Sequence, residues 1–276
     1  MNAGSLTKSA RAFILASGLI AVSTVIAAAQ DVPVSLGAAA TIPFSAWYVA
    51  PPTGQATLGG HSFNLSSGNL LQLPTASGTS QSYAGSYPNV TAVYLLLNTF
   101  NTSWWYQGAV VGTVVLTYSD GTTQSTDLTV GGNIREWRVG AAGTVNTVTD
   151  TATTLQAYST QVWSGTAQAT MGAGAAVIDM LTIKPLTTGK TLTSVTVNYT
   201  NTFGALRINL AGLTVDDVAP APPAPTPTTC EPKHTNDGHK ADTVKHLKHC
   251  DDADKSDGKA DVEKGDQPAA VQRHDD

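Results

Sequence analysis

The chain has 276 residues, 15 basic and 20 acidic, and a formal net charge of −5. Residues 30–218 hold only five basic and eight acidic residues, whereas residues 230–276 hold eight and twelve. Neither segment is basic overall, which argues against a nucleic-acid partner because phosphate binding needs clustered Lys and Arg. The change in composition predicts a boundary between a sparsely charged domain and a charged tail.

The first 29 residues have the composition of a signal peptide. Lys8 and Arg11 precede an apolar run over residues 12–28, and the small side chains of Ala27 and Ala29 predict cleavage after Ala29. A membrane anchor is the alternative, but a run of about 17 residues is at the short limit for crossing a bilayer. We therefore expect a secreted or cell-surface protein that keeps no stable membrane span after cleavage.

Residues 30–218 predict one all-β domain. Apolar and polar side chains alternate over residues 195–200 and 206–211, as in strands with one packed and one solvated face. Asp120–Gly121 lies between two strand-like segments and predicts a tight hairpin. Three further runs are more continuously apolar and are typical of central strands: 93–97, 110–118 and 177–183. Many short strands without helical periodicity predict a sandwich or a barrel.

Four motifs follow one another along this domain. They are Gly-Gly-His-Ser-Phe-Asn-Leu at 59–65, Val-Tyr-Leu-Leu-Leu-Asn-Thr at 93–99, Tyr-Ser-Asp-Gly-Thr at 118–122 and Asn-Ile-Arg-Glu-Trp at 133–137. Their order resembles extracellular bacterial jelly-roll domains of the galactose-binding-like type, relatives of the carbohydrate-binding modules of glycosidases. The resemblance covers residues 58–137 and extends more loosely to Leu213. It implies a jelly-roll β-sandwich, a sugar ligand in many members and a structural calcium ion in some.

Titratable side chains in the domain are too few and too scattered to predict an active site. His61 is the only histidine, cysteine is absent, and a glycosidase would need two carboxylates roughly 5 to 10 Å apart. Glu136 lies between Arg135 and Arg138, which predicts a surface ion pair. Asp179 shares a strand face with apolar residues, so we expect it at a strand end or a bulge. The sequence predicts a non-catalytic protein with no required cofactor.

Three consecutive aromatic residues predict a binding surface. Trp104, Trp105 and Tyr106 precede the strand at residue 110. Because successive strand residues point to opposite faces, at most Trp104 and Tyr106, or Trp105 alone, can be core, and at least one large ring must be exposed or in a loop. An exposed tryptophan can stack on the C–H face of a sugar while neighbouring amides bind its hydroxyl groups. The alternative is that these rings seal one end of the sandwich.

Further polar and aromatic residues complete this predicted ligand site. The candidates are Asn101, Gln107, and Tyr83 and Tyr87 from an expected loop before Pro88. The other three tryptophans, Trp47, Trp137 and Trp163, are predicted to lie in the core.

Beyond the domain, residues 219–229 read as a proline-rich linker and residues 230–276 as a disordered, charged tail. Cys230 and Cys250 are the only cysteines, and an oxidising location predicts a disulfide between them. Four histidines among carboxylates could bind a divalent metal, with solvated charge as the alternative: His234, His239, His246 and His249.

Together these patterns predict a secreted protein that recognises an extracellular glycan or another cell-surface polymer. A structural or adhesion module without a small ligand is the alternative.

Overall fold

The computed structural model describes residues 29–73, 78–202 and 204–218. Several predictions concern segments outside these residues: the signal peptide before Ala29, the linker over 219–229, and the tail with its disorder, disulfide and metal ligands. Within the described residues, no helix is long and apolar enough to cross a membrane.

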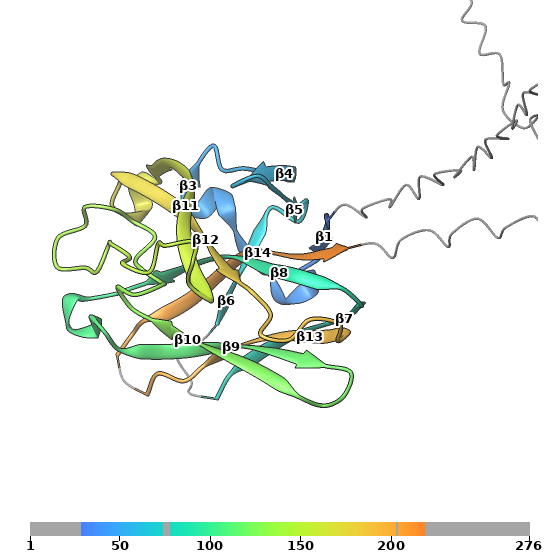
Figure 1. The fold of residues 1–276 in the computed structure, drawn as a ribbon. Helices are drawn as coiled ribbons and strands as arrows, with labels where there is room; N and C mark the ends of the chain where they lie inside the picture. The colour runs from blue at the N-terminus through green and yellow to red at the C-terminus, as the bar shows by residue number, and fades with distance from the viewer. Residues whose placement is uncertain (1–28, 74–77, 203, 219–276) are drawn as a thin grey trace, which may run out of the picture. The chain divides into compact units, whose positions relative to one another are not determined.

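The described chain forms two main antiparallel sheets and one separate hairpin (Figure 1). The larger sheet contains β1 (Ala29–Val34), β2 (Ile42–Pro43), β3 (Tyr48–Val49), β6 (Asn69–Leu73), β8 (Val90–Phe100), β11 (Ala157–Ala167), β12 (Ala175–Ile183) and β14 (Arg207–Val218). The smaller sheet contains β7 (Ser80–Tyr87), β9 (Val110–Tyr118), β10 (Thr123–Thr129) and β13 (Leu192–Tyr199). The hairpin pairs β4 (Gly54–Leu58) with β5 (His61–Leu65).

Four short 3₁₀ turns complete the described secondary structure. They are η1 (Gly37–Ala39), η2 (Phe44–Ala46), η3 (Trp104–Tyr106) and η4 (Ala169–Met171).

The strand order is that of a jelly roll. The larger sheet runs β2-β6-β14-β8-β12-β11-β3, with β1 also paired to β14, and the smaller sheet runs β10-β9-β13-β7. The chain therefore passes from β6 in one sheet to β7 in the other, returns to β8, crosses again to β9, and later makes the same crossing between β12, β13 and β14. This winding confirms the predicted all-β sandwich.

The main core lies between the two sheets. In β13, Val195, Val197 and Tyr199 are buried while the side chains between them are partly exposed, as their alternation predicts. They pack in one apolar cluster with inward-facing residues of the larger sheet, such as Leu95 and Leu181. The three runs predicted to be central form β8, β9 and β12.

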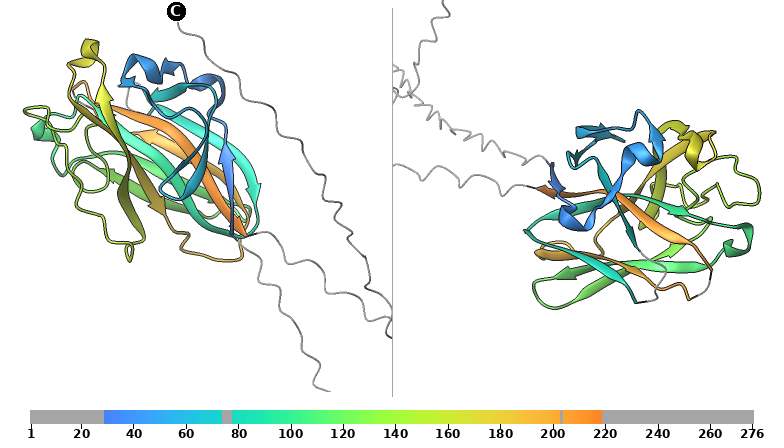
Figure 2. Two further views of the ribbon diagram at one scale, coloured as in Figure 1. Left: turned by 90° about the horizontal axis from the view of Figure 1, so that it is seen from above. Right: turned by 180° about the vertical axis from the view of Figure 1, so that it is seen from behind.

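The outer face of the larger sheet is also covered. The sequence predicts a solvated face for residues 206–211, but Asn209 and Ala211 are buried, at 3% and 7% exposure. The reason is that the N-terminal segments lie across this face (Figure 2). An aromatic cluster fills the space, with the rings of Trp47 and Trp137 5.1 Å apart. Trp47 and Trp137 are thus buried as predicted, whereas Trp163 is only partly buried.

The predicted hairpin joins β9 to β10. Gly121 has a φ of 82°, which glycine adopts without strain, and its N–H donates to the carbonyl of Tyr118 at 2.9 Å. The Asp120 carboxylate pairs with Lys190 Nζ at 2.6 Å and accepts from the Thr122 N–H at 3.0 Å. The hydrogen bond from Lys190 is the largest cause that holds the pKa of Asp120 below its usual value.

Candidate functional site

The aromatic triplet lies in a 3₁₀ turn, η3, within the loop that joins β8 to β9. With three residues per turn, the side chains point in three different directions. Trp104 is 67% exposed and Trp105 55% exposed, whereas Tyr106 is 1% exposed. The prediction that at least one ring is exposed is confirmed. The segment is a turn within a loop, which is the alternative to a strand, and burial separates Tyr106 from the surface formed by the two tryptophans.

The exposed rings of Trp104 and Trp105, here called the tryptophan pair, are held by backbone hydrogen bonds. The Trp104 N–H donates to the Gly143 carbonyl at 2.9 Å, and the Gly108 N–H donates to the Val130 carbonyl at 2.8 Å. The two rings meet edge to face, with centroids 5.9 Å apart and planes at 79°. The turn therefore presents two large apolar rings to solvent from a fixed backbone.

A buried carboxyl supports the base of this loop. One oxygen of Glu136 accepts the Thr102 N–H at 2.9 Å, and the Thr102 carbonyl accepts the Val145 N–H at 2.9 Å. Glu136 is 3% exposed, and desolvation raises its pKa to about 7. The predicted surface ion pair at Glu136 is therefore wrong, because the side chain points inward to satisfy loop backbone.

Two side-chain amides flank the tryptophan pair, as the sequence predicts. Asn101 is exposed, has a φ of 60°, and donates from Nδ2 to the Ala205 carbonyl at 3.3 Å. Gln107 is exposed and lies directly over Gly131, where a Cβ atom would collide with its amide. Among the described residues the Gln107 amide has no hydrogen-bond partner, so it is free to bind a hydroxyl group.

Tyr83 and Tyr87 do not join this surface. They belong to strand β7 rather than to a loop, and Tyr83 is only 7% exposed, with its pKa raised to about 12 by burial. Tyr87 pairs with Leu192, whose other neighbour is Tyr118 at the far end of β9 from the tryptophan pair. The predicted loop is wrong, because the Ser-, Gly- and Tyr-rich segment forms a strand that pairs with β13.

The sequence did not predict a row of polar side chains across the larger sheet, buried at its centre and more exposed at its two ends. Arg135 binds Asp179 through two hydrogen bonds, Nε to Oδ2 at 2.7 Å and Nη2 to Oδ1 at 2.8 Å. Asn98 Nδ2 donates to the same carboxylate at 3.0 Å, and Arg135 Nη2 also donates to Gln161 at 2.9 Å. The row crosses β6, β14, β8, β12 and β11 as Gln72, Asn209, Asn98, Asp179 and Gln161.

Asp179 lies in the middle of β12, so its expected place at a strand end is wrong. The bulge that the sequence suggested occurs opposite, in β11 between Gln161 and Trp163. The available signal was the scarcity of charge: an Asp in an otherwise apolar strand needs a partner, and few basic residues are available to supply one. Arg135 and Asp179 are 44 positions apart in the chain, so the sequence did not indicate that they pair.

A second titratable contact ties the N-terminal strand to the hairpin. His61 Nδ1 lies 3.0 Å from Asp31 Oδ1, and the His61 ring stacks on Tyr94 with centroids 3.6 Å apart. Among the described residues no group of three or more His, Cys, Asp or Glu side chains is placed to hold a metal ion. We interpret this contact as structural, because it holds β5 against β1.

Comparison with known proteins identifies no family for this chain. The chain matches no protein-family model, and a search of curated proteins finds no relative. The site must be interpreted from its own geometry.

Proposed function

We propose that the domain is a non-catalytic module that binds carbohydrate on an exported protein, with the tryptophan pair as its contact surface. The observation that carries the proposal is the exposure of Trp104 and Trp105, 67% and 55%, on a backbone-anchored turn. Large exposed aromatic rings cost free energy in water and are typical of binding surfaces. Fixed rings also lose little conformational entropy when a ligand stacks on them.

The neighbouring polar groups support a sugar ligand. Gln107 offers an amide that can both donate to and accept from a hydroxyl group, and the Oδ1 atom of Asn101 can accept from one. Apolar faces bordered by a few orienting polar groups are the usual composition of small-ligand sites. The resemblance to galactose-binding-like domains points the same way.

The buried acids support binding rather than catalysis. Glu136 is occupied by the Thr102 N–H, and Asp179 is occupied by Arg135 and Asn98. Each carboxyl is committed to holding the fold beneath the loops. A glycosidase mechanism instead needs two carboxyl groups that face a bound sugar.

A glycan array probed with the purified chain tests the proposal. We expect binding to a subset of glycans, and Trp104→Ala and Trp105→Ala should each weaken it by roughly tenfold through loss of stacking. Leu186→Ala is the matched control, because Leu186 is another exposed apolar side chain, at 70% exposure, near the opposite loops. It should leave binding unchanged.

The alternative gives a different result. A correctly folded chain that binds no glycan would favour a structural or adhesion module. Binding that survives both tryptophan substitutions would place the site elsewhere on the domain.

A further inference from the structure

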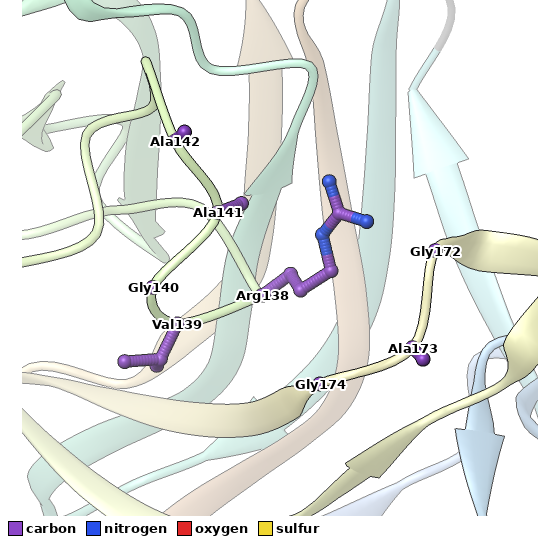
Figure 3. A pocket seen from close by; sticks show the side chains of 8 residues that line it. All are labelled: Arg138, Val139, Gly140, Ala141, Ala142, Gly172, Ala173 and Gly174. Atoms are coloured by element: carbon purple, nitrogen blue, oxygen red, sulfur yellow. The ribbon is translucent and has the colours of Figure 1, made fainter.

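A pocket of about 350 Å³ lies between two loop segments, residues 138–142 and 172–174 (Figure 3). Its walls are glycine, alanine and valine except for one side chain, that of Arg138, which extends between the two segments. The volume is within the range of small-ligand sites. The only charged group that lines this pocket is therefore a guanidinium.

The guanidinium is held in place but only partly used. Arg138 Nη1 donates to the Met171 carbonyl at 2.6 Å and lies against Gly172, where a Cβ atom would collide with it. Among the described residues Arg138 forms no ion pair, and its Nε and Nη2 atoms donate to none. These two atoms form the side of the guanidinium that matches the two oxygens of a carboxylate.

Backbone donors add to the same preference. Within the described residues the N–H groups of Gly140, Ala141, Ala142 and Gly174 donate no hydrogen bond. The neighbouring residue Ala173 has a φ of 50°, a conformation that non-glycine residues rarely adopt. The pocket thus combines a cation with unused amide donors, which suits an anionic oxygen group.

The acid that interacts electrostatically with Arg138 does not cancel its charge. Glu136 interacts electrostatically with Arg138, but its carboxyl is turned inward onto the Thr102 N–H and forms no ion pair with the guanidinium. Its raised pKa of about 7 also leaves it partly neutral near neutral pH.

The pocket and the turn that carries the tryptophan pair are joined by one loop. Ala142 lines the pocket, and the next residue, Gly143, accepts the Trp104 N–H at 2.9 Å through its carbonyl. One loop therefore forms a wall of the pocket and also anchors the turn that carries the tryptophans. A polymer that stacks on the tryptophan pair can place a neighbouring unit at Arg138.

We propose that Arg138 binds the carboxylate of an acidic polysaccharide whose adjacent sugar stacks on Trp104 and Trp105. This inference rests on the proposed carbohydrate function and specifies its ligand as a uronate-containing chain. Residues 30–218 contain more acids than bases, so the preference must come from this local cation rather than from net charge.

Calorimetric titration of the full chain with oligogalacturonate, and with the same oligomer methyl-esterified, tests the assignment. We expect the free acid to bind roughly tenfold more tightly, because a charge-assisted bidentate contact is lost on esterification. Arg138→Gln should remove that difference and leave affinity for the ester unchanged. Trp104→Ala should weaken both oligomers.

Two controls separate charge from geometry. Lys190→Gln removes one positive charge at the β9–β10 hairpin and should not change either affinity. Arg138→Lys keeps the charge without the planar fork and should restore only part of the preference for the acid. A thermal unfolding curve of Arg138→Gln checks that this variant is folded.

The possible failures are distinguishable. Equal binding of acid and ester by the wild-type chain, with both weakened by Trp104→Ala, would overturn the Arg138 assignment and leave the carbohydrate function standing. Tighter binding of a sulfated galactan than of oligogalacturonate would overturn the choice of a carboxylate. Failure to bind any oligomer on the array or in titration would overturn both proposals.

Discussion

The two ends of the sandwich place their charged groups in opposite environments. At the hairpin end, Asp120 and Lys190 pair at 2.6 Å in partly exposed positions. At the loop end, Arg135 and Asp179 pair at 2.7 Å with side chains only 10% and 2% exposed. The short β9–β10 turn satisfies its own backbone through bonds between Tyr118 and residues 121 and 122, whereas long irregular loops leave backbone groups that buried side chains must satisfy. Arg135 fulfils this role by donating from Nη1 to the Asn146 carbonyl at 2.8 Å, while Asp179 on β12 balances its charge.

The largest expected effect comes from breaking the buried pair. Arg135→Met leaves the Asp179 carboxylate without its cation and should lower the free energy of unfolding by about 3–5 kcal/mol. Urea denaturation followed by tryptophan fluorescence measures this change. Arg135→Met combined with Asp179→Leu should recover much of the loss, because no uncompensated charge remains. A single variant as stable as the wild type would show that the pair does not support the loop end.

The raised pKa of Glu136, whose carboxyl supports the loop that carries η3, predicts how the stability of the domain depends on pH. Its pKa is about 7 in the folded chain and near its ordinary value of 4.5 in the unfolded chain. Between these values the unfolded chain releases a proton that the folded chain keeps, so this group's stabilising contribution is lost as pH rises from 4.5 to 7. Glu136→Gln should remove that decline and make the protein more stable by up to about 3 kcal/mol near pH 8.

Denaturation curves at about pH 5 and about pH 8 check the sign. The difference between wild type and Glu136→Gln should be larger at the higher pH. An equal pH dependence in both proteins would mean that Glu136 is ionised in the fold across this range. Tryptophan fluorescence in the native baseline would report whether the η3 turn responds as well.

The smallest effect is expected at the hairpin end. Asp120→Asn keeps the side-chain acceptor for the Thr122 N–H at 3.0 Å but removes the charge that faces Lys190. Exposed ion pairs contribute little because water and salt screen them. The thermal midpoint should therefore hardly move. If Asp120→Asn lowered stability as much as Arg135→Met does, the exposed and the buried ion pair would not differ in their contribution.

Local patterns in the sequence were sufficient for the sandwich and for part of the site. The alternation at Val195–Tyr199 gives β13 its buried face, and Asp120–Gly121 gives the hairpin. Three adjacent rings indicated that at least one of them is exposed or in a loop. The alternation rule for strands could not predict the 3₁₀ turn of η3 or its long-range hydrogen bond from Trp104 to Gly143.

Long-range contacts explain the other errors. Asn209 is buried by N-terminal segments that the alternation over 206–211 cannot reveal. Arg138 follows Arg135 by three residues, yet one lines an open pocket and the other lies in the core. Single-sequence patterns do not distinguish such neighbours, since their environments are decided by Asp179 on β12 and by Met171 in η4.

The pairing of β1 with β14 has a mechanical consequence. Ala29 lies opposite Val218 in an antiparallel ladder, so tension between these two residues pulls the strands apart from one end. The hydrogen-bonded pairs between β1 and β14 would then break one after another, whereas force along the strands would load all of them at once. β14 also pairs with β8 from Val90 to Phe100, and the tryptophan pair follows Phe100 at the far end. The η3 turn therefore lies at the opposite end of β8 from the pairs that separate first.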